Sequence, residues 1–378
     1  MHRFIPAALL AALALGLTGA QSAFAAARHH DHHGQGRRLV FVQTNQPSGN
    51  AVAVFRRGHD GRLEAAGTYA TGGLGGAAAP GTESDRLASQ GSLAFNRSER
   101  ALVAVNAGSN TVSSFSVEGD RLRLVDVAPS GGSFPASVAT FGDLVYVLSS
   151  GGSGTVSGFQ LDHGALVPIP GSTRSLGLAN TTPPNFLTAP GQVGFSPNGR
   201  QLLVTTKAST SSIDVFQVGP DGRLSATPVV NPSATPVPFA FTFSPFARLV
   251  AGEAGASSVT TYTLSPTGSL TGPQSATDGQ VALCWIQRVG GYYFVANTGS
   301  NTLSSFTLTP GGQPVLLNAV AASTPAGPID LTASDRFLYG ETGLAGTVEE
   351  YAVQGDGSLV SIGSVTGLPA GIEGIAAS

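Results

Sequence analysis

The chain has 378 residues, of which only 11% are charged, while 51 are Gly and 24 are Pro. Charged residues that favour helices are scarce and turn residues are abundant, which indicates an all-β protein with many short strands. The net charge of −3 without a basic cluster argues against nucleic acid or an anionic membrane as partner, and a single Cys excludes an internal disulfide.

Residues 1–25 are expected to lie outside the fold. His2 and Arg3 precede an apolar run from Ile5 to Leu17, and Ala23-Phe24-Ala25 supplies the small residues of a cleavage site. The run is too short to span a bilayer, so this segment is predicted to be a secretory signal peptide. The mature protein is then expected to be secreted, or periplasmic in a cell with an outer membrane.

Residues 26–37 are predicted to be a disordered, His-rich tail. Within it, the segment Arg28-His29-His30-Asp31-His32-His33 carries imidazoles, which are good metal ligands. Two interpretations stay open, a metal-binding tail and an incidental weak chelator without a scaffold. We predict no metal site and no cofactor for the protein.

From residue 38 onward the chain repeats. Seven aromatic residues, each at the end of a short strand-like run, lie 44 to 60 residues apart: Phe55, Phe115, Phe159, Phe216, Tyr262, Phe306 and Tyr351. A Gly turn and a Leu follow most of them, as in Asp60-Gly61-Arg62-Leu63. A period of about 40–50 residues built of strands and turns is typical of a β-propeller. We therefore predict that residues 38–378 form a seven-bladed propeller with four antiparallel strands in each blade.

The order of strands is clearest in blade two, where residues 92–95, 101–105, 112–117 and 122–127 are separated by turns. The segment 371–377 resembles an innermost strand with no successor, and residues 39–42 resemble a second strand with no predecessor. We predict that the C-terminal strand closes the ring by completing blade one, which removes a free sheet edge.

Two connections are longer than the repeat requires, residues 72–89 and residues 171–189. Each joins the outermost strand of one blade to the innermost strand of the next. They are therefore predicted to lie on the rim that also carries the ends of the second strands. Functional loops concentrate in such places, although a flexible excursion is the other interpretation.

Polar residues recur just after the second strand of several blades. Asn106 and Asn297 lie in nearly identical segments, which is typical of turn residues, and both are also candidate ligand-binding residues. Lys207 and Glu253 interrupt the repeat with opposite charges on neighbouring blades. They are predicted to form either an ion pair between blades or a ligand-facing pair, and they are our candidate catalytic residues. Glu341 joins this set as a candidate ligand-binding residue if one residue is inserted in the alignment.

Two more candidate ligand-binding residues lie at the starts of innermost strands, Gln192 in blade four and Trp285 in blade six. Cys284 beside Trp285 is typical of a buried core, whereas a Trp at the channel mouth offers a ring for stacking. His59 and His163 are predicted to lie on the opposite rim. No histidine is thus placed for general-base catalysis at the candidate site.

The chain resembles the lactonase family of seven-bladed propellers, which includes 6-phosphogluconolactonase and the carboxymuconate cyclase type. The resemblance is carried by Phe195-Ser196-Pro197-Asn198-Gly199-Arg200, by the segment Asn297–Thr302 and by the closing strand Gly371–Ala377, and it covers Arg38–Ser378. It implies lactone hydrolysis or a cycloisomerase-like reaction, with a His, a Glu and several Arg around the channel mouth.

Those catalytic residues are missing at the matching positions of this chain. Ala189–Gln192 stands where the resemblance implies a His-Pro-His motif, and Leu283 stands near the implied Glu. Phe239, Ile329 and Thr298 stand where Arg is implied.

Two main hypotheses follow. The first is a secreted lactonase-family propeller that opens a lactone or a cyclic sugar acid, with Glu253 and Lys207 activating water and stabilising the carbonyl oxygen. The second is a non-catalytic propeller that binds a ligand, a glycan or a protein at the same mouth, or serves as a rigid interaction platform. The expected partner is a small molecule, with no nucleic acid and no membrane, and the expected state is a monomer.

Overall fold

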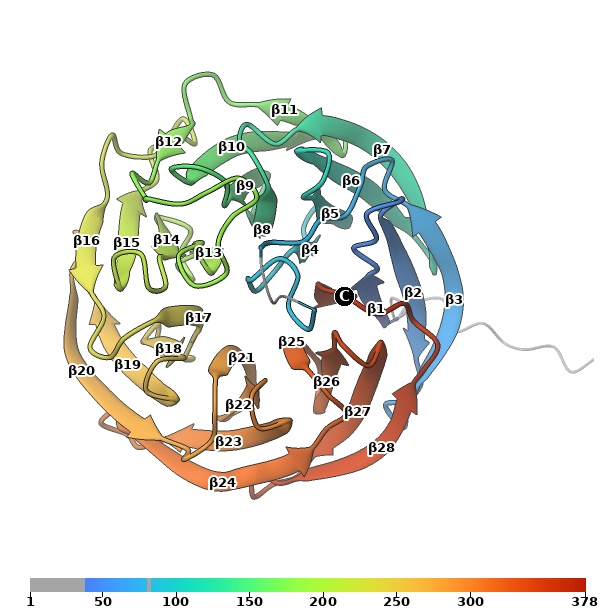
Figure 1. Ribbon diagram of the computed structural model, residues 1–378, viewed down its shortest axis with the longest axis vertical. Coiled ribbons are helices and arrows are strands. Elements are labelled where there is room, and N and C mark those ends of the chain that lie inside the picture. Colours follow the sequence, from blue (N-terminus) through green and yellow to red (C-terminus); the bar gives the residue numbers. More distant parts are fainter. Residues whose placement is uncertain (1–37, 80–82) are drawn as a thin grey trace, which may run out of the picture. The chain divides into compact units, whose positions relative to one another are not determined.

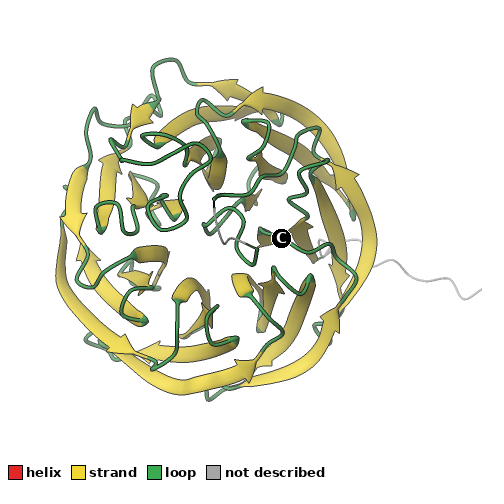
Figure 2. Ribbon diagram, in the orientation of Figure 1, coloured by secondary structure: helices red, strands yellow, loops and turns green. Residues whose placement is uncertain are grey.

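The computed structural model describes residues 38–79 and 83–378, and the predicted signal peptide and His-rich tail lie outside these residues. In the described part, seven antiparallel sheets are arranged as blades around a common axis (Figure 1). Strands and loops make up this part, without an α-helix (Figure 2). No helix there is long and apolar enough to cross a membrane. The predicted all-β, seven-bladed propeller is thereby confirmed.

The first three blades contain the chain ends and the first insertion. Blade one consists of β29 (Ile375–Ala377), β1 (Leu39–Gln43), β2 (Ala51–Arg57) and β3 (Leu63–Ala70). Blade two consists of β4 (Leu93–Asn96), β5 (Ala101–Asn106), β6 (Thr111–Glu118) and β7 (Arg121–Pro129). Blade three consists of β8 (Pro135–Phe141), β9 (Leu144–Ser149), β10 (Thr155–Asp162) and β11 (Ala165–Pro168), with the short β12 (Arg174–Ser175) also paired to β10.

The other four blades follow the same order from the axis outward. Blade four consists of β13 (Gln192–Phe195), β14 (Gln201–Thr205), β15 (Ser212–Gln217) and β16 (Val229–Pro232). Blade five consists of β17 (Pro238–Phe243), β18 (Leu249–Glu253), β19 (Ser258–Leu264) and β20 (Leu270–Thr277). Blade six consists of β21 (Leu283–Val289), β22 (Tyr292–Asn297), β23 (Thr302–Leu308) and β24 (Pro314–Ser323). Blade seven consists of β25 (Pro328–Ser334), β26 (Phe337–Thr342), β27 (Thr347–Val353) and β28 (Leu359–Val365).

The C-terminal strand closes the ring as predicted. β29 pairs antiparallel with β1, with Val40 opposite Ala377 and Val42 opposite Ile375. The amide of Leu39 also donates to the Ser378 hydroxyl at 2.9 Å. Blade one is therefore built from both ends of the described chain, with β29 as its innermost strand.

The inner strands are buried on both faces because each blade packs between two neighbours. In β5, Leu102 and Ala104 belong to the apolar cluster shared with blade one, whereas Val103 and Val105 belong to the cluster shared with blade three. Alternate residues of a second strand therefore face opposite neighbours, which explains why these strands read as continuous apolar runs.

The recurrent Gly turns fit tightly against the preceding blade. Gly61 has φ of +90° and packs against Phe337, which a Cβ atom on Gly61 would meet at 2.3 Å. The hydroxyl of Tyr339 donates to the Gly61 carbonyl at 2.6 Å. A side chain at this turn would therefore be strained and would clash, which explains the repeated Gly.

Candidate functional site

A cavity of about 440 Å³ lies between the two insertions and the strand ends of blades four, five and six. It is lined by Ser84, Asp85, Phe186, Leu187, Lys207, Val237, Phe239, Ala254, Gly255, Ala282, Cys284, Trp285, Thr298 and Gly299. These residues come from both insertions and from blades four, five and six. The cavity therefore lies on the rim predicted for the site.

The two insertions contact each other beside this cavity. Ala79 and Asn185 form an isolated parallel β-bridge. The amide of Ala79 donates to the Pro184 carbonyl at 2.9 Å, and the amide of Phe186 donates to the Ala79 carbonyl at 3.3 Å. The segment between β3 and β4, drawn light blue, reaches the middle of the ring (Figure 1). The insertions thus brace one another and form one wall of the site.

Bulges in the innermost strands turn side chains toward the common axis. The registers of β17, β21 and β25 shift near their first residues, which leaves Phe239, Cys284 and the Ile329–Asp330 pair outside the regular pairing. A bulge bends its strand and redirects a side chain, often next to a functional site. Phe239 and Cys284 consequently line the cavity, and Asp330 is buried close behind it.

Three cavity residues other than Gly have positive φ angles, namely Lys207 at +46°, Ala282 at +61° and Val237 at +64°. The left-handed region is unfavourable for a β-branched side chain such as Val. Such strained residues concentrate where the surrounding structure holds a binding or catalytic geometry. Val237 and Ala282, however, precede innermost strands, and Phe134 and Gly327 have positive φ at the same position in blades three and seven, so this conformation belongs to the repeat.

Within residues 38–79 and 83–378, Lys207 is the one cationic side chain that lines the cavity. Its buried ammonium donates to the carbonyls of Ala88 at 2.6 Å and Phe186 at 2.7 Å. It also lies over the rings of Phe186, at 5.0 Å, and Phe239, at 4.9 Å. Burial lowers the pKa of Lys207 to about 8, against the opposing effect of the Asp85 carboxylate. An ammonium has three N–H donors, so one remains for a ligand.

Asp85 and Glu373 form a carboxyl pair that was not predicted from the sequence. Glu373 accepts the amide of Leu87 at 2.6 Å. Glu373 Oε1 and both Asp85 oxygens have no donor within ordinary hydrogen-bond geometry, although the backbone amides of Ala88 and Ser89 lower the pKa of Asp85. Burial raises the pKa of both groups, and a hydrogen bond between the two carboxyls lowers the pKa of Asp85 and raises that of Glu373. Two carboxyls in hydrogen-bond contact in a buried site do not both ionise readily, so the pair holds one proton between them.

Two further buried acids lie behind this pair. Asp330 accepts the amides of Gly91 at 3.1 Å and Leu331 at 2.9 Å, and burial raises its pKa to about 7. Glu341 accepts the amide of Gly374 at 2.9 Å, and burial followed by the charge of Asp330 raises its pKa well above its usual value. We call Asp85, Asp330, Glu341 and Glu373 the acid cluster. No group of three or more His, Cys, Asp and Glu within residues 38–79 and 83–378 is arranged to hold a metal ion.

Glu341 does not line the cavity, although it was predicted to ring the mouth with the other candidates. It lies one residue before Thr342, which pairs with Thr347 at the end of β26. Its side chain therefore faces blade one, where it meets the start of the closing strand. Its ligand-binding role stays a prediction that this position does not favour.

Glu253 is also buried, and it too lies outside the cavity lining. Its carboxylate accepts hydrogen bonds from five hydroxyl groups, those of Ser233, Thr235, Ser258, Thr260 and Tyr262. The ion pair considered between Glu253 and Lys207 does not form, because Lys207 donates to carbonyls instead. The catalytic role of Glu253 stays a prediction that this geometry does not favour.

Asn106 and Asn297 occupy the same structural position as Glu253. The side-chain amide of Asn106 donates to Thr111 and Ser113, and that of Asn297 donates to Thr302 and Ser304. Glu253 contacts the equivalent residues five and seven positions later. All three residues tie the second strand to the third, which favours the turn interpretation over ligand binding.

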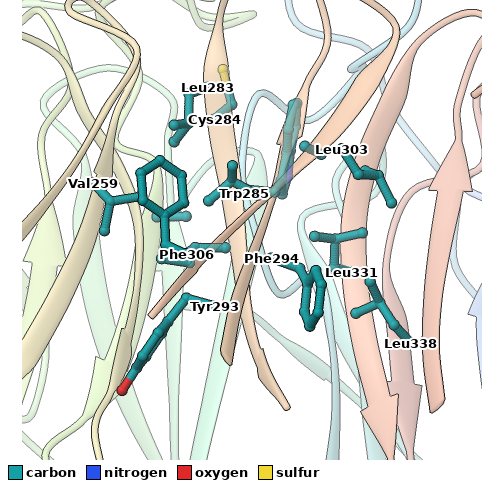
Figure 3. Close-up of a cluster of buried hydrophobic side chains, with 14 of the residues drawn as sticks. Val259, Leu283, Cys284, Trp285, Tyr293, Phe294, Leu303, Phe306, Leu331 and Leu338 are labelled. Carbon is teal, nitrogen blue, oxygen red and sulfur yellow. The ribbon is translucent and has the colours of Figure 1, made fainter. Parts of the chain in front are cut away.

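Of the two candidates at the starts of innermost strands, Trp285 lines the cavity and Gln192 does not. Gln192 accepts the amide of Phe241 at 2.6 Å between blades four and five and does not line the cavity. Trp285 does line it, donates to the Ser89 carbonyl at 3.0 Å and packs on Phe239 with ring centroids 4.8 Å apart. Figure 3 shows Trp285 and Cys284 within the apolar cluster of blade six. Trp285 is thus both a core residue and a cavity wall.

The two histidines within the repeats lie where they were predicted. His59 follows β2 and His163 follows β10, so both lie in turns between a third and a fourth strand. These turns are at the opposite end of the blades from the cavity. Neither residue is part of the site.

No family model matches the chain, and no curated protein matches its sequence. Solved structures do match. A candidate 6-phosphogluconolactonase from Bacteroides fragilis has a TM-score of 0.70 at 16% identity, covering 91% of this chain and 98% of that one. The periplasmic gluconolactonase of Pseudomonas aeruginosa has a TM-score of 0.68 at 18% identity, covering 89% and 98%. A Lactobacillus plantarum protein reaches 0.70 at 19% identity, covering 90% and 99%.

These neighbours are seven-bladed propellers of the 6-phosphogluconolactonase type, so the predicted resemblance is confirmed for the architecture. At identities below 20% the likeness establishes the fold alone. The chemistry must be argued from the cavity itself.

Proposed function

We propose that the cavity binds a small cyclic ester and that the protein hydrolyses it. The observation that carries this proposal is the placement of the Lys207 ammonium and the Asp85 carboxyl in the lining of one apolar cavity. Lactone opening requires a group that removes a proton from water and a donor for the carbonyl oxygen. Asp85 and Lys207 supply these two functions, with Asp85 in the place first considered for Glu253.

The reaction can be written on these residues. The Asp85 carboxylate takes a proton from water while the water oxygen bonds to the carbonyl carbon of the lactone. The free N–H of Lys207 stabilises the resulting oxyanion. Collapse of the tetrahedral intermediate breaks the ring C–O bond, and the leaving alkoxide receives a proton from the Asp85–Glu373 pair. The product is a hydroxy acid, and the pair, which held two protons after the attack of water, again holds one.

The carboxyl pair suits this task because two neighbouring carboxyls in a buried site cannot both ionise readily, which separates their pKa values. One member stays available as a base while the other keeps a proton, as in other paired-carboxyl active sites. The raised pKa of Asp85 also makes it a stronger base than an exposed aspartate.

A second candidate function is ligand binding without turnover. It is favoured by the composition of the lining, which within the described residues includes neither His nor Arg. It is also favoured by Lys207, two of whose three donors already bind carbonyls. In this alternative the same cavity holds a small molecule at the mouth without opening it.

The predicted leader and the periplasmic gluconolactonase among the structural neighbours support a location outside the cytoplasm. The monomeric state stays a prediction.

Hydrolysis by the purified protein, followed as acid release from γ- and δ-lactones, tests the proposal. Turnover by the wild type should fall about 100- to 1000-fold in Lys207→Met, which removes the oxyanion donor. Ligand binding can be followed in parallel through Trp285, the only Trp of the chain. Binding without any turnover would contradict hydrolysis and would establish the second candidate.

A further inference from the structure

The lining of the cavity offers little to a polyhydroxylated ring. Its walls are mostly apolar, with Phe186, Val237, Phe239 and Trp285 among them. Among the described lining residues, Ser84 and Thr298 are the ones with hydroxyl groups, and Thr298 already donates to the Pro328 carbonyl at 2.8 Å. A sugar ring entering here would lose hydrogen bonds to water without replacing them, which costs binding free energy.

Apolar side chains continue from the cavity onto the rim. Leu187 lines the cavity and is 56% exposed. Val281 is 60% exposed and packs against the lining residue Gly299, where an added Cβ atom would meet a Val281 methyl at 2.6 Å. Leu344, 48% exposed, packs on the same Gly327 as Ser84. Exposed apolar side chains grouped at the edge of a pocket are typical of a binding surface.

The charges around the cavity disfavour an anionic substrate. A phosphate group is bound in proteins by Arg, Lys and several N–H donors acting together. Here Lys207 supplies the one cation, with one unused N–H, while Asp85 stands in the same lining. The charge of Asp85 acts on Asp330 and Glu373, which in turn interact with Glu341.

We infer that the site selects uncharged lactones that carry an alkyl or acyl chain, and that it discriminates against sugar lactones and their phosphates. The lactone carbonyl lies toward Lys207, the ring contacts the aromatic walls, and the chain leaves over Leu187 and Val281. This inference rests on the proposed function and names its substrate class.

The expected selectivity follows from the area that each methylene buries. One buried CH₂ group is worth about a fourfold gain in affinity, so kcat/KM and affinity should rise by up to this factor with each added carbon. The increase in kcat/KM and affinity should stop once the alkyl substituent extends beyond Leu187 and Val281.

The experiment uses a series of γ-lactones with substituents from methyl to octyl, together with glucono-δ-lactone and its 6-phosphate. Hydrolysis gives kcat/KM, and the fluorescence of Trp285 gives the affinity of each compound. The rim variants are Leu187→Ser and Val281→Ser. Val360→Ser is the matched control, because Val360 is 50% exposed on the outer strand β28.

A rise with chain length that is flattened by both rim variants, but not by Val360→Ser, is the expected result. Hydrolysis without chain dependence, or tighter binding of the 6-phosphate, would overturn the inference and leave the proposed function intact. If no lactone is hydrolysed but affinity still rises with chain length, the proposed function fails and the selectivity stands.

Discussion

Glu253 and Asp85 are two buried carboxyls near the same rim, and their surroundings differ completely. Glu253 accepts hydrogen bonds from five hydroxyl groups and contacts no cavity. Asp85 has only the amides of Ala88 and Ser89 near it as weak donors among the described residues, forms a hydrogen bond with Glu373 and lines a cavity that also contains Lys207. A buried charge whose partners are complete serves the fold, whereas an incompletely paired one beside a cavity is available for chemistry.

Deleting residues 371–378 should have the largest effect, because it removes both β29 and Glu373 from the Asp85 side of this comparison. The deletion would remove the buried Ile372 and Ile375 from their apolar cluster, β1 would become an exposed edge, and the Leu87 amide would lose its acceptor. We expect a loss of several kcal/mol or of soluble protein, measured by thermal melting. Glu373→Gln, which keeps the strand, is the control, and a truncated protein that melts like the full chain would refute the closure.

Glu253→Ala should destabilise the fold by roughly 3–5 kcal/mol, because it leaves five buried hydroxyls without their common acceptor. Urea unfolding measures this change. Glu64→Ala is the control, since the Glu64 side chain is 77% exposed in its ion pair with Arg56. Equal stability of the two variants would show that Glu253 does not hold blades four and five together.

The acid cluster should make stability fall as pH rises. The pKa of Asp330 rises from 3.8 to about 7 on burial, so the folded state binds more protons than the unfolded state between about pH 4 and 7. The free energy of unfolding should drop across this window, with Asp330 contributing on the order of 4 kcal/mol. Asp330→Asn should remove this contribution. Urea unfolding at pH 5 and pH 7.5 tests it, and an unchanged difference between the two pH values would contradict the assignment.

The architecture could be predicted because it depends on features that repeat. The seven aromatics are buried on third strands, the Gly turns pack on the preceding blade, and the closing strand pairs with β1. The aromatics and the Gly turns recur from blade to blade, so the propeller can be recognised from a single sequence.

The site was only partly predictable because its residues lie where the repeat is broken. Asp85 belongs to an insertion, Glu373 to the segment just before β29, and Asp330 to a bulge where blades five and six carry Phe239 and Cys284. Glu253 lies at the end of a second strand, as predicted, but its side chain does not line the cavity. Second-strand residues alternate between neighbouring blades, and Glu253 falls on the face toward blade four. An acid inside the apolar segment Gly371–Ala377 was the signal that could have revealed Glu373.

The most direct test of the account compares Asp85→Asn with Glu253→Gln on the same lactone at pH 7.5. Both variants remove one carboxylate with little change in size, and thermal melting confirms that each is folded. If Asp85 is the base, Asp85→Asn lowers kcat/KM by about 100- to 10,000-fold while Glu253→Gln stays within about threefold of the wild type. A large loss in Glu253→Gln with turnover retained in Asp85→Asn would contradict the account.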